Sequence, residues 1–142
     1  MNILVIDAQG GGLGKQLIAA LRKNFPDMDI TAVGTNTMAT AVMLKAGATH
    51  AATGENAVVV GCRKADIIIG PLAIVIADSM FGEITPAMAL AVAQSNAKRI
   101  LIPFNHCDNI VVGIGDYNMT ALIQEAVDEV ARTIKNSPPR LR

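Results

Sequence analysis

The sequence is poor in aromatic residues, charged residues and cysteine. Of its 142 residues, 3% are aromatic and 17% are charged, there is no tryptophan, and the formal net charge is zero. Because it has neither a basic run nor an aromatic stacking surface, we expect no nucleic-acid partner. Cys62 and Cys107 lie far apart with no CxxC pattern and no paired histidine spacing, so we predict neither a metal site nor a disulfide framework.

The sequence also lacks an apolar run long enough to cross a bilayer. Its most apolar stretch, residues 67–80, is interrupted by Gly70, Pro71 and Asp78. This stretch is too short for a membrane span, which needs about 20 apolar residues. The chain begins directly in a predicted strand, without the pattern of a signal peptide. We therefore expect a cytoplasmic protein with no membrane partner.

Aliphatic residues dominate the composition of the chain. Hydrophobic residues make up 51% of the chain, a content typical of a parallel sheet covered on both faces. The excess of apolar surface also predicts a homo-oligomer, with a dimer as the simplest form. The length predicts a single domain over residues 1–136, followed by a flexible tail at 137–142.

Strand and helix patterns alternate along the chain. Apolar runs predict strands at about 2–7, 29–33, 48–52, 66–71 and 99–103. Helical spacing and capping residues predict helices at about 13–24, 37–46, 55–63, 72–80, 86–95 and 119–134. Within 72–80, the β-branched residues 74–76 would also suit a strand. A further apolar run, 110–112, follows the strand at 99–103 too closely for a crossover helix to fit between them. It therefore predicts an antiparallel edge strand or a short extension.

This order predicts an α/β fold: a doubly wound, mostly parallel Rossmann-like sheet of five to six strands with helices on both faces. Ligands of such sheets bind beyond the carboxyl ends of the strands, where the strand order reverses. The sequence places a glycine-rich turn, residues 10–15, at the first of these ends. Glycine permits close approach, and the following helix start offers free amides and a positive dipole end to an anion.

The turn fits no phosphate-binding motif completely. In the pattern GxGxxG, a register from Gly10 puts Lys15 in the third glycine position, and a register from residue 9 puts Gln9 in the first. The second strand ends in Gly34, Thr35 and Asn36, so no carboxylate follows it to bind a ribose. A Walker loop also fails, because Gln9 and Gln16 replace its first glycine and its magnesium-binding hydroxyl. Two interpretations stay open: a phosphate site, or a turn whose glycines only let helix pack on strand.

The leading hypothesis is a module that binds a nucleotide or another phosphate-bearing small ligand, with a dinucleotide included, in a regulatory role. The predicted binding residues lie in the turn and at neighbouring strand ends: Asp7, Gln9, Gly10, Gly11, Gly12, Leu13, Gly14, Lys15, Thr35, Asn36, Glu55 and Gly70. Three of them also have simpler roles. Asp7 can accept hydrogen bonds from the amides of its own turn, Lys15 can be a solvated helix residue, and Glu55 can cap a helix.

Two alternatives remain. The first is an enzyme that uses Asp7, Glu55 and His106 or Cys107 on a small substrate, with Asp78 and Glu83 facing the same cleft. A polar hairpin turn is the simpler interpretation of the His106 and Cys107 pair. The second alternative is a structural oligomer that meets its partners through residues 72–81.

Four motifs together resemble a bacterial family, the domain of unknown function 3842. They are IDxQGGGLGK at 6–15, ATGENA at 52–57, DIIxGP at 66–71 and GEITP at 82–86. The similarity runs from residue 1 to about residue 134. It implies a Rossmann-like fold and transfers no activity.

Overall fold

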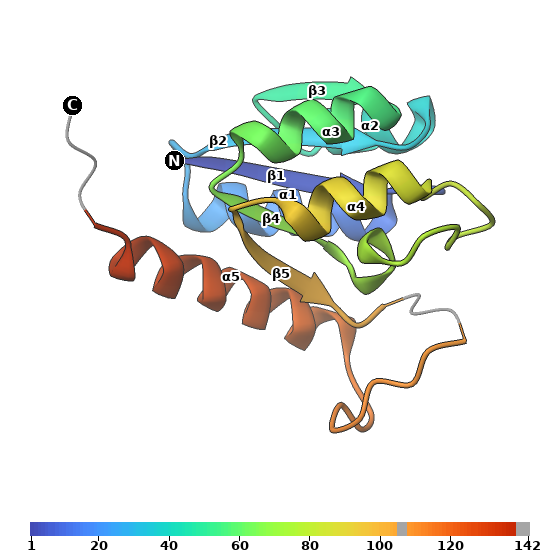
Figure 1. Cartoon of the computed structure of the whole chain (residues 1–142). Helices are drawn as coiled ribbons and strands as arrows, with labels where there is room; N and C mark the ends of the chain where they lie inside the picture. The colour runs from blue at the N-terminus through green and yellow to red at the C-terminus, as the bar shows by residue number, and fades with distance from the viewer. Residues whose placement is uncertain (105–107, 139–142) are drawn as a thin grey trace.

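The computed structural model describes residues 1–104 and 108–138. These residues form a five-stranded parallel sheet in the order β3-β2-β1-β4-β5 (Figure 1). The strands are β1 (Asn2–Asp7), β2 (Asp29–Gly34), β3 (His50–Thr53), β4 (Ile67–Pro71) and β5 (Lys98–Ile102). The predicted α/β, Rossmann-like fold is confirmed, because this strand order reverses between β1 and β4 as in a doubly wound sheet.

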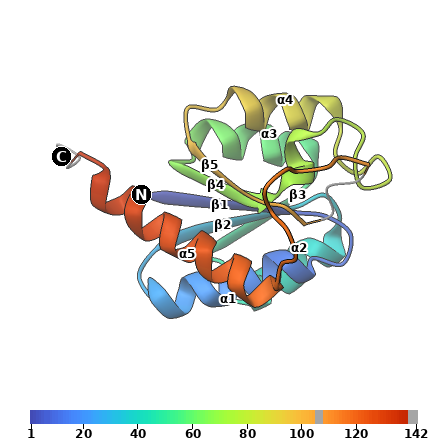
Figure 2. The same cartoon turned by 90° about the horizontal axis from the view of Figure 1, so that it is seen from below.

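Helices cover both faces of the sheet. Figure 2 shows α3 (Glu55–Lys64) and α4 (Pro86–Gln94) on one face, and α1 (Gly12–Asn24), α2 (Thr37–Lys45) and α5 (Met119–Asn136) on the other. The central strands are accordingly buried on both sides, with Ile3 paired to Ile30 in β2 and Ile67 in β4. Since α1 follows β1 and α5 is the helix after β5, both helices begin near the carboxyl edge of the sheet.

The helix starts follow the capping rules that predicted them. The side chain of Asn36 accepts a hydrogen bond from the amide of Ala39 at the start of α2. Thr85 caps α4 with Pro86 in its first turn, and Asn118 caps α5. None of the helices within 1–104 and 108–138 has both the length and the apolarity needed to cross a membrane.

The predicted sixth strand at 110–112 is wrong. These residues are irregular, and Ile110 and Val112 are 90% and 93% exposed. The chain leaves the sheet after β5 and turns at Gly113 and Gly115, which adopt φ values of 92° and 62°. Apolar composition alone does not make a strand when no neighbouring strand receives its hydrogen bonds.

The predicted helix at 72–80 is also wrong beyond its first turn. Residues Leu72–Val75 form one 3₁₀ turn, η1. Asp78, Met80 and Phe81 then adopt positive φ values, which end any right-handed helix. The hydroxyl of Ser79 donates to the carbonyl of Ala73 at 2.7 Å and holds the chain in this turn. Ile76, directly after this turn, is already extended, a conformation that β-branched residues favour.

Candidate functional site

Asp7 connects the end of β1 to the start of α1. Its carboxylate is 3% exposed and accepts hydrogen bonds from the amides of Ala8 at 2.8 Å and Gly14 at 2.7 Å. Gly14 carries the third amide of α1, so Asp7 neutralises part of the positive helix end. Burial raises the pKa of Asp7, the two amide bonds lower it, and the nearby Glu83 raises it; the net direction is upward. The simpler role predicted for Asp7 is confirmed by these contacts.

The structure selects the second register of the glycine pattern. Gln9 has a φ of 52° in the first position, and Gly11 has a φ of 73° in the second. A Cβ atom on Gly11 would lie 2.6 Å from Cγ2 of Val42, and one on Gly14 would lie 2.4 Å from Sδ of Met43. Gly11 and Gly14 therefore let the turn and α1 pack closely against α2. In the motif itself, close packing of the helix is the use of the third glycine, whereas the second lets the backbone approach a ligand.

Gly10 and Gly12 have no such structural reason. A Cβ atom on either residue would meet nothing within 4 Å, and neither has a positive φ. The packing interpretation therefore accounts for Gly11 and Gly14 but not for Gly10 and Gly12. Open space above these two glycines is what a ligand approaching the backbone would need.

A cavity of about 360 Å³ lies over the turn. Its lining comes from the end of β1, the turn, the start of α1, the loop before α4, the segment after β5 and the first residue of α5. The lining residues are Asp7, Ala8, Gln9, Gly10, Gly11, Gly12, Leu13, Gln16, Met80, Phe104 and Met119. This volume lies in the lower part of the range of small-molecule sites, about 300–1,000 Å³.

The amides around this cavity are only partly occupied. The amide of Gly11 donates to the carbonyl of Ala8 at 3.0 Å, and that of Gly14 donates to Asp7. Within the described residues, the amides of Gly10, Gly12 and Leu13 have no hydrogen-bond partner. A helix start with unoccupied amides beside a cavity has the geometry of an anion site.

Glu83 brings a carboxylate to the end of β2 from the loop between β4 and α4. Its Oε1 atom accepts hydrogen bonds from the amide of Gln9 at 3.0 Å, the hydroxyl of Thr35 at 2.7 Å and Nδ2 of Asn36 at 2.8 Å. Nδ2 of Asn36 also donates to the carbonyl of Gln9 at 2.9 Å. The expectation that no carboxylate stands at this strand end is wrong, because a segment distant in sequence supplies it.

The hydrogen bonds of Glu83 predict a pH dependence of stability. Burial alone would raise the pKa of Glu83, but its bonds from Gln9, Thr35 and Asn36 together lower it below the ordinary 4.5. A carboxyl whose folded pKa is lowered stabilises the fold above its unfolded pKa and loses this contribution on acidification. Glu83→Gln should therefore have a flatter stability profile than the unmodified protein between about pH 5 and pH 3.

Urea unfolding over this pH range measures the effect. Glu55→Gln is the matched control, because Glu55 is exposed at the start of α3, away from the turn. Parallel profiles for Glu83→Gln and the unmodified protein would show that the three hydrogen bonds do not hold in solution.

The other predicted residues divide between the turn and separate positions. Lys15 is exposed and does not line the cavity, whereas the next residue, Gln16, does. Thr35 and Asn36 bind Glu83. Glu55 is outside the cavity lining, and Gly70 is buried in β4, where a Cβ atom would lie 2.6 Å from the carbonyl oxygen of Ile6.

Some predicted residues lie outside the part of the chain that the structure describes or away from the cavity, and several lining residues were not predicted. His106 and Cys107 lie outside the described residues, and Asp78 is exposed at a φ of 65°. The lining residues not predicted are Ala8, Gln16, Met80, Phe104 and Met119. Phe104 lies two residues beyond β5, so the strand-end rule could have pointed to it. No local pattern points to Met80. Among the described residues, no three His, Cys, Asp or Glu side chains are grouped to hold a metal ion.

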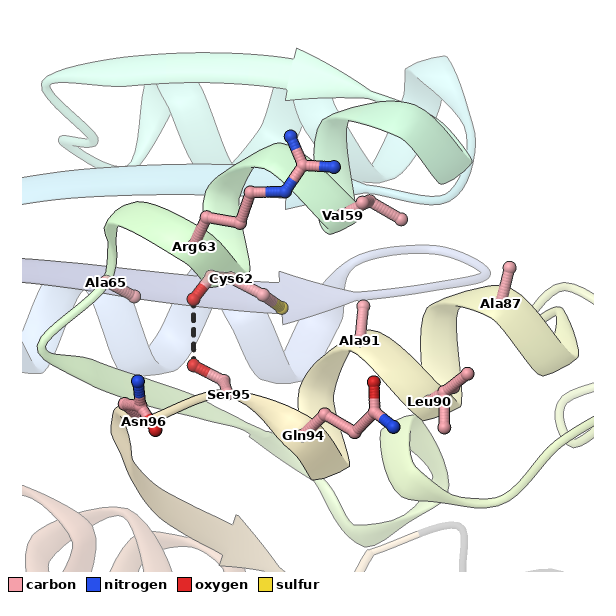
Figure 3. A pocket seen from close by; sticks show the side chains of 10 residues that line it. All are labelled: Val59, Cys62, Arg63, Ala65, Ala87, Leu90, Ala91, Gln94, Ser95 and Asn96. Atoms are coloured by element: carbon pink, nitrogen blue, oxygen red, sulfur yellow. Dashed lines mark hydrogen bonds between the residues drawn. The ribbon is translucent and has the colours of Figure 1, made fainter.

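A larger cavity, about 570 Å³, lies between α3 and α4 (Figure 3). The hydroxyl of Ser95 donates to the carbonyl of Cys62 at 2.7 Å and ties the ends of the two helices together. Burial raises the pKa of Cys62 to about 11, so this thiol is protonated and unreactive at neutral pH. Except for Ala87 in the first turn of α4, this cavity is lined by the sides and carboxyl-terminal ends of the two helices, and size alone does not make it the better site.

Comparison with known proteins identifies the family of this chain and a distant structural neighbour. No curated protein matches the sequence. The dodecameric FMN-dependent UbiX-like decarboxylase from Escherichia coli O157:H7 is similar in structure, with 14% sequence identity and a TM-score of 0.46; the match covers 100% of this chain and 99% of that one. The family described as Domain of unknown function (DUF3842) matches residues 2–135. Because this match spans nearly all of the sequence, the chain belongs to the DUF3842 family.

Proposed function

We propose that this chain binds a phosphate-bearing small molecule, with a nucleotide as the ligand class, in the cavity over the turn. The observation that carries the proposal is the pair Gly10 and Gly12, glycines with no conformational or packing requirement that line a cavity beside unoccupied amides. A phosphate placed there would accept from the amides of Gly12 and Leu13.

We further propose that the role is regulatory binding rather than catalysis. Asp7 is the titratable side chain in the described cavity lining, and both of its oxygens already accept backbone hydrogen bonds. A general base needs an oxygen within reach of a substrate proton. An occupied, buried carboxylate suits the support of a binding loop better than proton transfer.

Gly12→Val tests the proposed site. Calorimetric titration with the four common nucleoside monophosphates should detect binding to the unmodified protein by at least one of them. The valine side chain would project into open space over the helix start and block access to the amides. Losing one or two charge-assisted hydrogen bonds should weaken affinity by about tenfold or more.

The control for this variant is Ala19→Val. Ala19 is exposed on the same helix and does not line the cavity, so this change should leave the affinity as it was. Thermal unfolding would verify that both variants are folded. Full affinity in a folded Gly12→Val protein would place the ligand elsewhere.

We also propose that the protein self-associates. Ile110, Val111 and Val112 are consecutive apolar residues that are 90%, 36% and 93% exposed, and contiguous exposed apolar surface is typical of interaction sites. Of the surface predicted at 72–81, Ala73, Ile74 and Met80 are buried, and Phe81 is its fully exposed large apolar side chain. Sedimentation velocity should give a mass above one subunit, and Ile110→Asp with Val112→Asp should lower it. A monomer at all concentrations would contradict this proposal.

A further inference from the structure

Building on the proposed function, we infer that the ligand carries a single phosphate and is of mononucleotide size, and that Glu83 closes the β2 side of the site against dinucleotides. Figure 1 shows the loop that carries Glu83 at the edge toward which the strand arrows point. The inference depends on the direction in which the cavity extends, on the contacts of Glu83, and on the charges around the turn.

The cavity extends from the turn toward β5 and α5. Beyond the turn and α1, its lining residues are Met80, Phe104 and Met119, and none of the described lining residues belongs to β2, α2 or β3. A dinucleotide on a sheet of this strand order needs space on both sides of the turn, toward β5 and toward β2, because its adenosine ribose lies against the end of β2. The space present therefore accommodates one half of such a ligand.

Glu83 fills the space on the other side of the turn, at the end of β2. Oε1 of Glu83 is held by the amide of Gln9 and by the side chains of Thr35 and Asn36, and the second bond of Asn36 ties this group to the turn. These contacts place the loop before α4 against the end of β2. A ribose arriving there would have to break three hydrogen bonds to a carboxylate, which are individually stronger than neutral ones.

The charges near the turn favour a ligand with few negative charges. No lysine or arginine is among the described lining residues, whereas Asp7 lines the cavity and Glu83 accepts from the amide of Gln9. Each additional phosphate adds repulsion from these carboxylates without adding a cationic partner. One phosphate at the amides of Gly12 and Leu13 uses the available donors.

The rest of the cavity suits a planar ring. Leu13, Met80, Phe104 and Met119 supply apolar and aromatic surface, and Gln9 and Gln16 add amide groups among the lining residues. Aromatic and methionine side chains bind the faces of rings, and amide side chains can pair with the edge of a base. A nucleoside monophosphate has both parts, a ring and one phosphate.

Titration calorimetry with adenosine monophosphate, adenosine diphosphate and NAD tests the inference. The unmodified protein should bind the monophosphate about tenfold more tightly than either of the others. Glu83→Ala should narrow the difference between the monophosphate and NAD to a few-fold, because it frees the end of β2. Glu125→Ala, at an exposed position on α5 outside the cavity lining, should preserve the original ratio.

The outcomes separate this inference from the proposed function. If NAD binds the unmodified protein as tightly as the monophosphate, and Gly12→Val abolishes both, the site stands and the size limit is overturned. If Glu83→Ala folds and keeps the original ratio, the role of Glu83 is overturned. Should Glu83→Ala fail to fold, Glu83→Ser, which also removes the carboxylate from the end of β2, gives the same comparison. If no phosphate compound binds, both the proposed function and this inference are wrong.

Discussion

Gly11→Ala should lower the free energy of unfolding by about 3 kcal/mol, as expected for a left-handed non-glycine residue combined with overpacking. Gly11 has a φ of 73°, which an alanine adopts only with strain. The added Cβ atom would also lie 2.6 Å from Cγ2 of Val42 and 2.8 Å from Cα of Ala39. The side chain of Val42 could rotate, but the backbone of α2 could not move without disturbing its packing. Urea unfolding measures the difference.

Gly10→Ala is the matched control for this change. Residue 10 has a φ outside the left-handed region and open space where the Cβ atom would lie. Its stability should stay within about 0.5 kcal/mol of the unmodified protein, as for most surface substitutions. Equal stability of the Gly11→Ala and Gly10→Ala proteins would mean that the turn is not packed against α2 as described.

Asp7→Ala should cost about 2–4 kcal/mol of stability, because unsatisfied buried polar groups cost roughly 1–3 kcal/mol each. The change leaves the amides of Ala8 and Gly14 without their acceptors. It also creates a small cavity between β1 and α1. The measurement is again urea unfolding, with the exposed Asp116→Ala as control.

The pH dependence of this variant gives a second readout. The pKa of Asp7 is raised above its ordinary 3.8 in the folded protein. A folded state that binds the proton more tightly than the unfolded chain is stabilised at low pH, and this contribution declines as pH rises from 3.8 through the raised pKa. The cost of Asp7→Ala should therefore be largest in acid. A cost that grows toward neutral pH would mean that the carboxylate is stabilised, not destabilised, by its site.

Much of the fold follows from local patterns. The strand runs, the caps at Asn36 and Asn118, and the pair Thr85 and Pro86 each depend on neighbouring residues, so the sequence was sufficient to place them. The predictions of a helix at 72–80 and a strand at 110–112 were wrong because they depended on apolar composition, which does not indicate the tertiary contacts of a segment. Positive φ values at Asp78, Met80 and Phe81 are imposed by the loop as a whole and have no glycine to indicate them.

For the candidate site, the sequence predicted the glycine-rich turn but not the residues that reach it from distant segments. The turn itself was evident from its glycines, but the sequence did not separate Gly11 and Gly14, which pack against α2, from Gly10 and Gly12, which face open space. Glu83 reaches Thr35 across 48 positions, and such a contact has no periodic signal. The correct register of the motif likewise depends on φ values that only the structure provides.

The most direct test of a ligand at the start of α1 is a ¹H–¹⁵N spectrum of the labelled protein titrated with the nucleoside monophosphate that binds it most tightly. We expect the amide resonances of Gly10, Gly12 and Leu13 to shift most. Those of Gly11 and Gly14, whose amides already donate hydrogen bonds within the protein, should shift less. Saturable shifts confined to the groove between α3 and α4, with Gly12 and Leu13 unmoved, would contradict it.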